Sequence, residues 1–324
     1  MKIRANQTDI EVEDSGTLPL GPQGAARPVV LLIMGLGMQL VAWPQAMVQA
    51  LADAGYRVVC FDNRDIGKSQ FFDAMGKPNL ILQTLKHKLG LPIRPPYSLT
   101  DMANDAIGVL DTLKIGQAHI VGVSMGGMIA QRVAIAAPHK VLSLTSIMSS
   151  SGARGLPQAK GPVVRALLSR PANNTESAIA DHYVKLFKII GSPGFPIDPE
   201  ESRQRIMEGI QRSFHPVGTL RQMVSIAADT KRPDELASIN CPTLVIHGKA
   251  DPLVPYANGV DTAKRIAGAH LVGIEGMGHD LPPGVVTQLL ACMLPFFAQA
   301  TDKTALQKEN KEKDKEEDKE AKRA

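Results

Sequence analysis

The chain has 324 residues, of which 44% are apolar, 21% charged and 4% aromatic, and its 36 Lys and Arg stand against 32 Asp and Glu. This length and apolar content suffice for a large core and exclude collagen-like, coiled-coil and wholly disordered proteins. The formal net charge of +4 forms no basic stripe along the sequence, and few aromatic side chains are available to stack on bases. Nucleic acid is therefore not an expected partner.

Charge concentrates at the C-terminal end of the sequence. Residues 302–324 hold eight Lys or Arg and eight Asp or Glu. With almost no apolar face, this segment cannot contribute to a core. We expect a charged, disordered tail, and the alternation of Lys and Glu leaves a solvated helix as the alternative.

The cysteines and the N-terminus indicate the cellular compartment. Cys60, Cys241 and Cys292 are odd in number, far apart and surrounded by apolar residues, which predicts buried thiols in a reducing compartment. The N-terminus lacks the apolar core of a signal peptide, and the longest apolar run, Pro28–Met38, is about half a membrane span. We expect a cytoplasmic protein without a membrane span, and the sequence leaves its oligomeric state open.

Short apolar runs alternate with helix-length amphipathic segments over most of the chain. This alternation is typical of strand–helix–strand units on a mainly parallel sheet, and so predicts an α/β fold. The Ser98–Leu113 segment opens with Ser98 and Asp101 spaced as in a capping box. In chain order, the sequence predicts strand Val29–Met34, helix Trp43–Ala54, strand Arg57–Phe61, helix Ser98–Leu113, strand Ala118–Val121, helix Met125–Ala137, strands Val141–Ile147 and Thr243–His247, helix Asn258–Ala267, strand His270–Ile274 and helix Val285–Ala298.

Two stretches depart from this alternation. Residues 149–240 carry helical patterns without an evident strand, which predicts a helical insertion above a core made of residues 1–148 and 241–301. Residues 71–96 join a strand to the Ser98 helix and mix apolar with basic residues. They form either a flank of a binding site or a long surface connection.

A candidate nucleophile, Ser124, lies in the sequence Gly122-Val-Ser-Met-Gly126, directly after a predicted strand and at the start of a helix. Gly-x-Ser-x-Gly at such a turn holds the serine hydroxyl above the sheet in a strained backbone, which only small flanking residues allow. The helix N-terminus there favours anionic species. An ordinary helix cap is the structural alternative for Ser124.

A serine nucleophile needs a base oriented by an acid. Of eight histidines, His279 lies on a Gly-rich loop just past the last predicted strand. Asp251 follows the strand Thr243–His247, at the sheet edge where ligands of α/β proteins bind. Asp280 is too close to His279 in sequence to orient its ring easily. The chain order Ser124, Asp251, His279 matches that of α/β-hydrolases.

Backbone donors for an oxyanion are expected from two places. One is the N–H of Met125, directly after the serine, and the other belongs to the loop Met34-Gly-Leu-Gly-Met38, where position favours Leu36. Gly35 and Gly37 would let that backbone approach a substrate, although a simple turn explains both glycines equally well.

The sequence resembles the α/β-hydrolase fold superfamily and, within it, the aclacinomycin methylesterase-like bacterial esterases. The resemblance spans most of residues 25–300. It implies a helical cap between the sixth and seventh strands, and it places nucleophile, acid and base at Ser124, Asp251 and His279. The residues that carry the resemblance are Leu32-Ile-Met-Gly-Leu-Gly-Met38, Phe61-Asp-Asn-Arg-Asp-Ile-Gly-Lys-Ser69, Gly122-Val-Ser-Met-Gly-Gly127, Thr243-Leu-Val-Ile-His-Gly-Lys-Ala-Asp251 and Gly276-Met-Gly-His279.

Two departures from the wider superfamily are visible. The loop that commonly begins His-Gly begins Met34-Gly35, which removes a polar side chain but no backbone donor. The turn after the fourth strand is Asn63-Arg64-Asp65 where many relatives have Arg-Gly, and we interpret Arg64 as an anchor of this loop.

Together these features predict a serine hydrolase that cleaves carboxylic esters through an acyl-enzyme on Ser124. The expected partner is a small-molecule ester, and no metal or organic cofactor is needed. The same three residues would serve a C–C bond hydrolase or an acyltransferase, and a non-catalytic ligand-binding protein could use the same scaffold. The sequence does not identify the substrate.

Overall fold

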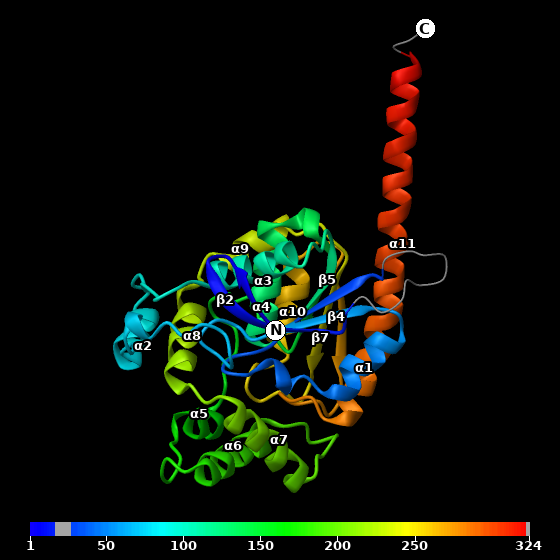
Figure 1. The fold of residues 1–324 in the computed structure, drawn as a ribbon. Helices are drawn as coiled ribbons and strands as arrows, with labels where there is room; N and C mark the ends of the chain where they lie inside the picture. Colours follow the sequence, from blue (N-terminus) through cyan, green and yellow to red (C-terminus); the bar gives the residue numbers. More distant parts are fainter. Residues whose placement is uncertain (17–26, 322–324) are drawn as a thin grey trace.

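The computed structural model describes residues 1–16 and 27–321 of the chain. An eight-stranded sheet with the order β1-β2-β4-β3-β5-β6-β7-β8 forms its centre, and helices cover both faces (Figure 1). The first two strands pair antiparallel, and β2 pairs antiparallel with β4, whereas all the other pairs are parallel. The predicted α/β fold with a mainly parallel sheet is therefore confirmed.

The strands that follow the N-terminal hairpin agree closely with those predicted. The residues of β3, β5 and β7 are buried along their whole length, as in parallel strands covered on both faces. The strands are β3 (Val29–Ile33), β4 (Arg57–Phe61), β5 (Ala118–Val123), β6 (Val141–Ile147), β7 (Thr243–Gly248) and β8 (His270–Ile274).

Sequence analysis missed an N-terminal hairpin, β1 (Lys2–Ala5) and β2 (Thr8–Asp14). Its two-residue turn is formed by Asn6 and Gln7, whose φ angles are +47° and +60°. In β2, Ile10 and Val12 are fully buried and alternate with polar residues. This period of two is the signal that could have identified the hairpin.

Helices α3, α4 and α10 cover one face of the sheet, and α1 and α11 cover the other. Small residues let α4 lie close to β5 and β6, whereas α1 and α11 pack against each other and against the strands through larger side chains. The helices on these faces are α1 (Gln45–Asp53), α3 (Leu99–Thr112), α4 (Met125–Ala136), α10 (Ala257–Arg265) and α11 (Pro283–Ala321).

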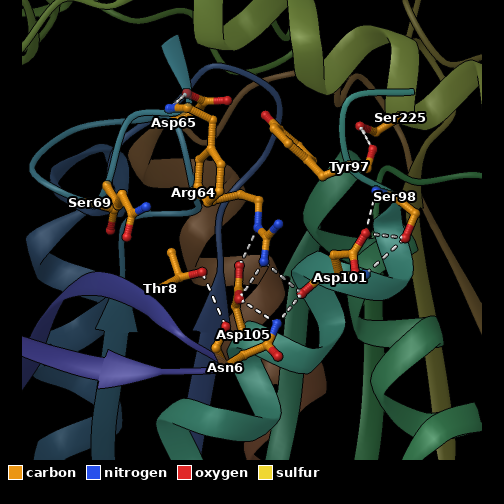
Figure 2. A network of polar contacts seen from close by, with 12 residues as sticks. Asn6, Thr8, Arg64, Asp65, Ser69, Tyr97, Ser98, Asp101, Asp105 and Ser225 are labelled. Atoms are coloured by element: carbon orange, nitrogen blue, oxygen red, sulfur yellow. Dashed lines mark hydrogen bonds and ion pairs between the residues drawn. The ribbon is translucent and has the colours of Figure 1, made fainter. Parts of the chain in front are cut away.

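The capping box predicted at Ser98 is present. The Ser98 Oγ accepts a hydrogen bond from the Asp101 N–H at 3.1 Å, and the Asp101 carboxylate accepts one from the Ser98 N–H at 2.7 Å. Both bonds are visible in Figure 2. They satisfy N–H groups that have no partner inside α3 and so fix the start of this helix.

Five α-helices and a short 3₁₀ helix lie between β6 and β7, where no strand was expected and none of the described residues forms one. We call this part the α5–α9 segment; α5, α6 and α7 lie at the bottom of Figure 1, α8 runs along the left side of the body, and α9 lies near its top. The connection at residues 71–96 also contains a helix, α2 (Leu80–Lys88), which packs against α8. The α5–α9 segment consists of α5 (Gly161–Leu168), α6 (Glu176–Ile190), α7 (Pro199–Arg212), α8 (Pro216–Ala228) and α9 (Arg232–Glu235).

Helix α11 begins in the core and continues beyond it (Figure 1). Residues Pro283–Asp302 are long and apolar enough to cross a membrane, but Val285, Leu289 and Phe297 are fully buried in the core, as in a packed helix of a globular domain. The expectation of a disordered tail from residue 302 differs from the structure, in which the helix extends to Ala321. Lys and Glu both have high intrinsic helix propensity, which favours this helical form.

The core holds a neutral histidine whose protonation opposes folding. His119 is fully buried, lies 2.8 Å from the Ser143 Oγ through its Nδ1, and stacks on Phe297 at 4.5 Å between ring centroids. Burial lowers the pKa of His119 from 6.5 to about 4. The unfolded chain therefore binds a proton at this residue between pH 6.5 and pH 4 that the folded chain does not.

We expect His119 to make the protein acid-sensitive. Its contribution to the free energy of unfolding is present above pH 6.5 and is lost as the pH falls toward 4, a decrease of about 3 kcal/mol. The variant His119→Asn should be less stable at pH 7 but lose less stability over this range. Urea denaturation at several pH values tests this, with the exposed His139→Asn as a control; an unchanged pH dependence in His119→Asn would contradict it.

Candidate active site

Ser124 lies at a sharp turn between β5 and α4. Its φ of +54° and ψ of −121° are a conformation that residues other than glycine rarely adopt. The Ser124 N–H donates to the Ile147 carbonyl at 2.9 Å, and the Ser124 carbonyl accepts a hydrogen bond from the Ser149 hydroxyl at 2.7 Å. Its side chain makes no cap for α4, so the capping role considered for Ser124 is not observed.

The glycines around Ser124 permit this turn because the backbone segments there almost touch. A Cβ on Gly122 would lie 2.1 Å from the Gly126 carbonyl oxygen, and one on Gly126 would lie 2.0 Å from the Ile33 carbonyl oxygen. Both distances are far below van der Waals contact, so no other residue fits without movement of β3 or α4. The sequence pattern around the serine is therefore a packing requirement.

The three predicted residues Ser124, His279 and Asp251 meet above the ends of the parallel strands. The His279 Nε2 lies 3.0 Å from the Ser124 Oγ, and its Nδ1 lies 2.7 Å from the Asp251 Oδ2. The Asp251 side chain is fully buried, whereas Ser124 is partly exposed. A hydroxyl, an imidazole and a carboxylate thus form one continuous hydrogen-bonded chain.

Asp251 is held by the turn that follows β7. Its Oδ1 accepts hydrogen bonds from the N–H groups of Leu253 and Val254, both at 2.9 Å, which leaves Oδ2 for His279. A second ring, His247, lies 3.6 Å from the same Oδ2, and burial lowers the pKa of His247. The Nε2–H of the neutral His247 donates to the Val254 carbonyl at 2.7 Å, and this ring adds no positive charge beside Asp251.

The loop that carries His279 is fixed by the end of α6. The His279 N–H donates to the Ile190 carbonyl at 2.7 Å, and the Gly278 N–H donates to the Ser192 Oγ at 2.8 Å. The Ser192 hydroxyl in turn donates to Asp280, whose pKa is raised by burial. Asp280 therefore helps to hold the loop, and the ring of His279 is oriented by Asp251.

The loop that contains Leu36 lies directly against Ser124, because a Cβ on Gly35 would be 3.2 Å from the Ser124 Cβ. The side chain of Gln222 in α8 holds the other end of this loop. Its Oε1 accepts from the Gly37 N–H and its Nε2 donates to the Arg64 carbonyl, both at 3.0 Å. The Leu36 N–H has no acceptor in the described part of the chain and so stays available to a ligand.

Arg64 anchors the turn after β4, as the sequence predicts. Its guanidinium binds Asp105 of α3 through two hydrogen bonds of 2.6 and 2.7 Å (Figure 2). It also lies over the rings of Phe72 and Tyr97, about 5 Å from each centroid. The adjacent Asp65 makes a similar fork with Arg221 of α8, at 2.7 and 2.8 Å, and both of these side chains are fully buried.

A cavity of about 1570 Å³ adjoins the site. Gly37 and Asp280, each next to a residue of the site, belong to its wall, whereas Ser124, Asp251 and His279 do not. Five aromatic side chains contribute to the wall, together with aliphatic residues of α6 and α7. These aromatic residues are Trp43, Tyr183, Phe187, Phe195 and Phe214.

Sequence analysis missed two side chains that support the site, Gln222 and Ser192. Both lie in the α5–α9 segment, far from their partners in sequence, and no motif marks them. Only the folded chain shows that they reach the loops of Leu36 and His279.

Among the described residues, no group of three or more His, Cys, Asp or Glu could hold a metal ion.

Comparison with known proteins agrees with this architecture. The profile of the family described as "alpha/beta hydrolase fold" matches residues 28–282, and the chain belongs to this family. Rhodomycin D methylesterase DauP of Streptomyces sp. (strain C5) is 31% identical over 294 residues, which cover 84% of this chain and 91% of that protein. Rhodomycin D methylesterase DnrP of Streptomyces peucetius is 29% identical over the same shares. The resemblance to methylesterases of this kind is confirmed.

Solved structures show the same fold at lower identity. The meta-cleavage product hydrolase CumD of Pseudomonas fluorescens IP01 superposes with a TM-score of 0.70 at 20% identity, over 93% of this chain and 98% of that one. The enol-lactonase of Burkholderia xenovorans LB400 superposes with a TM-score of 0.63 at 19% identity, over 92% and 100%. These likenesses concern the fold alone.

The backbone strain at Ser124 can be measured. Glycine adopts a positive φ without the Cβ penalty, so Ser124→Gly should unfold with a free energy about 1 kcal/mol higher than Ser124→Ala. Both variants lose the hydroxyl, and their difference therefore isolates the backbone term. Urea denaturation at pH 7 provides the comparison, and a Gly variant no more stable than the Ala variant would show that the turn is unstrained.

Proposed function

We propose that this protein is a carboxylesterase that acts through an acyl-enzyme on Ser124. The observation that carries the proposal is the hydrogen-bonded chain from the Ser124 Oγ through His279 to the buried Asp251. The methylesterase relatives support a hydrolase that acts on esters.

The arrangement supports a two-step reaction. The Ser124 Oγ attacks the ester carbonyl carbon while the His279 Nε2 takes its proton, and Asp251 stabilises the resulting imidazolium. His279 then returns the proton to the leaving alkoxide, which departs as the alcohol and leaves the acyl group on Ser124. Water, deprotonated by His279, attacks the acyl-enzyme, and release of the acid restores the Ser124 hydroxyl.

The negative charge that develops on the carbonyl oxygen requires donors. We assign them to the backbone N–H groups of Met125, the first residue of α4, and of Leu36, on the loop beside Ser124. The N–H of a first helical residue has no partner within its helix, and the helix N-terminus favours an anion. One such donor is worth about 3 kcal/mol of transition-state stabilisation.

The cavity suggests the form of the ester. Although the chain has only 13 aromatic residues, five of them line this cavity. Together with the methylesterase relatives, this favours a methyl ester of an acid with a bulky, flat apolar group, held by the α5–α9 segment acting as a cap over the sheet.

A cytoplasmic location stays a prediction.

The variant Ser124→Ala tests the nucleophile. It should lower the turnover of a short-chain nitrophenyl ester by at least about 1,000-fold, because no group remains to form the acyl-enzyme. A fluorophosphonate probe should label the wild type and leave this variant unlabelled, and the exposed Ser238→Ala should behave like the wild type.

Three outcomes would contradict the proposal. Turnover retained by a folded Ser124→Ala protein would exclude the serine mechanism, and a wild type that the probe does not label would favour a non-catalytic scaffold. Transfer of the acyl group to an added alcohol in preference to water would indicate an acyltransferase.

Gln222 allows a test of the loop beside Ser124. The variant Gln222→Met removes the acceptor of the Gly37 N–H and should lower kcat by about 10- to 100-fold with little change in KM, because a displaced Leu36 N–H weakens the transition state. Ser225→Ala is a matched control, since Ser225 is buried in the same helix and donates to the Tyr97 carbonyl at 2.6 Å without contacting this loop. Equal losses of kcat in both variants would attribute the effect to α8 packing.

A further inference from the structure

Helix α2 and the residues just after it expose apolar side chains that a globular domain normally covers. The exposed fraction is 84% for Ile81, 54% for Leu85, 63% for Leu89 and 51% for Leu91. The helix stands out from the body at the left of Figure 1 and packs mainly against α8. Such clustering on one projecting element is typical of an interaction surface.

Helix α5 also exposes apolar side chains. Leu167 is 43% exposed and Leu168 is 71% exposed. The connection before α5 meets the connection after α2, because a Cβ on Gly90 would lie 3.5 Å from the Arg154 Nη1. We call the exposed residues of 77–94 and 154–170 the α2–α5 surface.

The two segments that form this surface are basic and lack acidic residues. Residues 77–94 contain four Lys or Arg, residues 154–170 contain four more, and neither stretch contains Asp or Glu, although the whole chain has 36 basic and 32 acidic residues. Arg94, Arg154 and Arg165 are exposed and form no ion pair with any residue that the structure describes. The segments are distant in sequence, so only the fold gathers this charge.

A groove with basic side chains in its wall adjoins the same surface. This groove of about 400 Å³ between α5 and α6 is lined by Arg165, His182 and Lys185 together with apolar residues such as Leu186. Cationic side chains beside exposed leucines provide both interactions that a charged lipid surface offers, namely headgroup anions and apolar chains.

We propose that the α2–α5 surface docks the protein on an anionic lipid surface. Ile81, Leu85 and Leu168 enter the boundary between headgroups and acyl chains, and the surrounding Lys and Arg contact the anionic headgroups. A second copy of the chain is a poorer occupant, because a two-fold contact through this surface would place its positive charges against one another. The proposal is independent of the esterase activity.

The test is flotation of the full chain with vesicles of phosphatidylcholine. One set of vesicles also contains about 30 mol% phosphatidylglycerol, which gives them a negatively charged surface. The wild type should bind the anionic vesicles, and 0.5 M NaCl, on the order of three times physiological salt, should release it. The triple variant Arg94→Gln, Arg154→Gln and Arg165→Gln should bind about 100-fold more weakly, at about fivefold for each charge. The variant Ile81→Gln with Leu168→Gln should also bind at least about tenfold more weakly.

The matched control removes three exposed positive charges elsewhere, in Lys2→Gln, Lys114→Gln and Lys264→Gln, and should bind like the wild type. Thermal unfolding checks that each variant folds. No binding of the wild type to anionic vesicles, equal binding to phosphatidylcholine alone, or an equal loss in the control would overturn the proposal. If the wild type forms a dimer, and the double variant Ile81→Gln with Leu168→Gln is a monomer, the surface binds a second copy of the chain and the proposal is wrong.

Discussion

Close approach of three backbone segments at Gly122 and Gly126 determines most of the site. Strand β3, strand β5 and helix α4 meet there at distances that exclude any Cβ, and Ser124, between the two glycines, is left with a positive φ. The same contact directs the serine side chain away from the sheet, toward the loops that follow β3, β7 and β8. The order of these strands then brings Gly35, Asp251 and His279 to one edge of the sheet, since parallel strands end together. Burial of β5 and α4 in the core stabilises the strained turn that the chemistry requires.

The α5–α9 segment supports this edge through side-chain and backbone hydrogen bonds. Helix α8 contributes Gln222 to the loop beside Ser124, and the end of α6 contributes Ser192 and the Ile190 carbonyl to the loop of His279. The buried fork between Arg221 and Asp65 ties α8 to the turn after β4. Removal of one partner would leave a buried charge unpaired, which makes this ion pair costly to break. The loops of the proposed oxyanion donor and of the proposed base are thus positioned by the α5–α9 segment as well as by the strands that precede them.

Much of this arrangement could be predicted from the sequence, because local patterns encode it. Apolar runs located six parallel strands, the spacing of Ser98 and Asp101 located a helix start, and glycines around Ser124 located the turn. The hairpin before β3 was missed although Ile10 and Val12 alternate with polar residues. For the charged tail, a disordered segment was predicted where the structure has a helix. The contacts of Gln222 and Ser192, the aromatic wall of the cavity and the contact between Gly90 and Arg154 could not be predicted. Each joins residues that are distant in sequence and depends on how helices without distinctive motifs pack.

The bonds between the end of α6 and the loop of His279 also restrict how a substrate can enter. Movement of Ile190 or Ser192 away from the sheet would withdraw His279 and Gly278 with it, because each is held there by a hydrogen bond of at most 2.8 Å. An opening motion that keeps the site intact must therefore pivot about residues 190–192. The wall of the cavity includes Gly191 and Ser192 of this pivot and continues along α7 and the loop of Met38. The C-terminal end of α7 is held as well, because the Gln39 Nε2 donates to the carbonyls of Gly209 and Ser213, both at 2.6 Å. A motion that admits a bulky molecule while the imidazole stays beside the serine must therefore leave this end of α7 in place too.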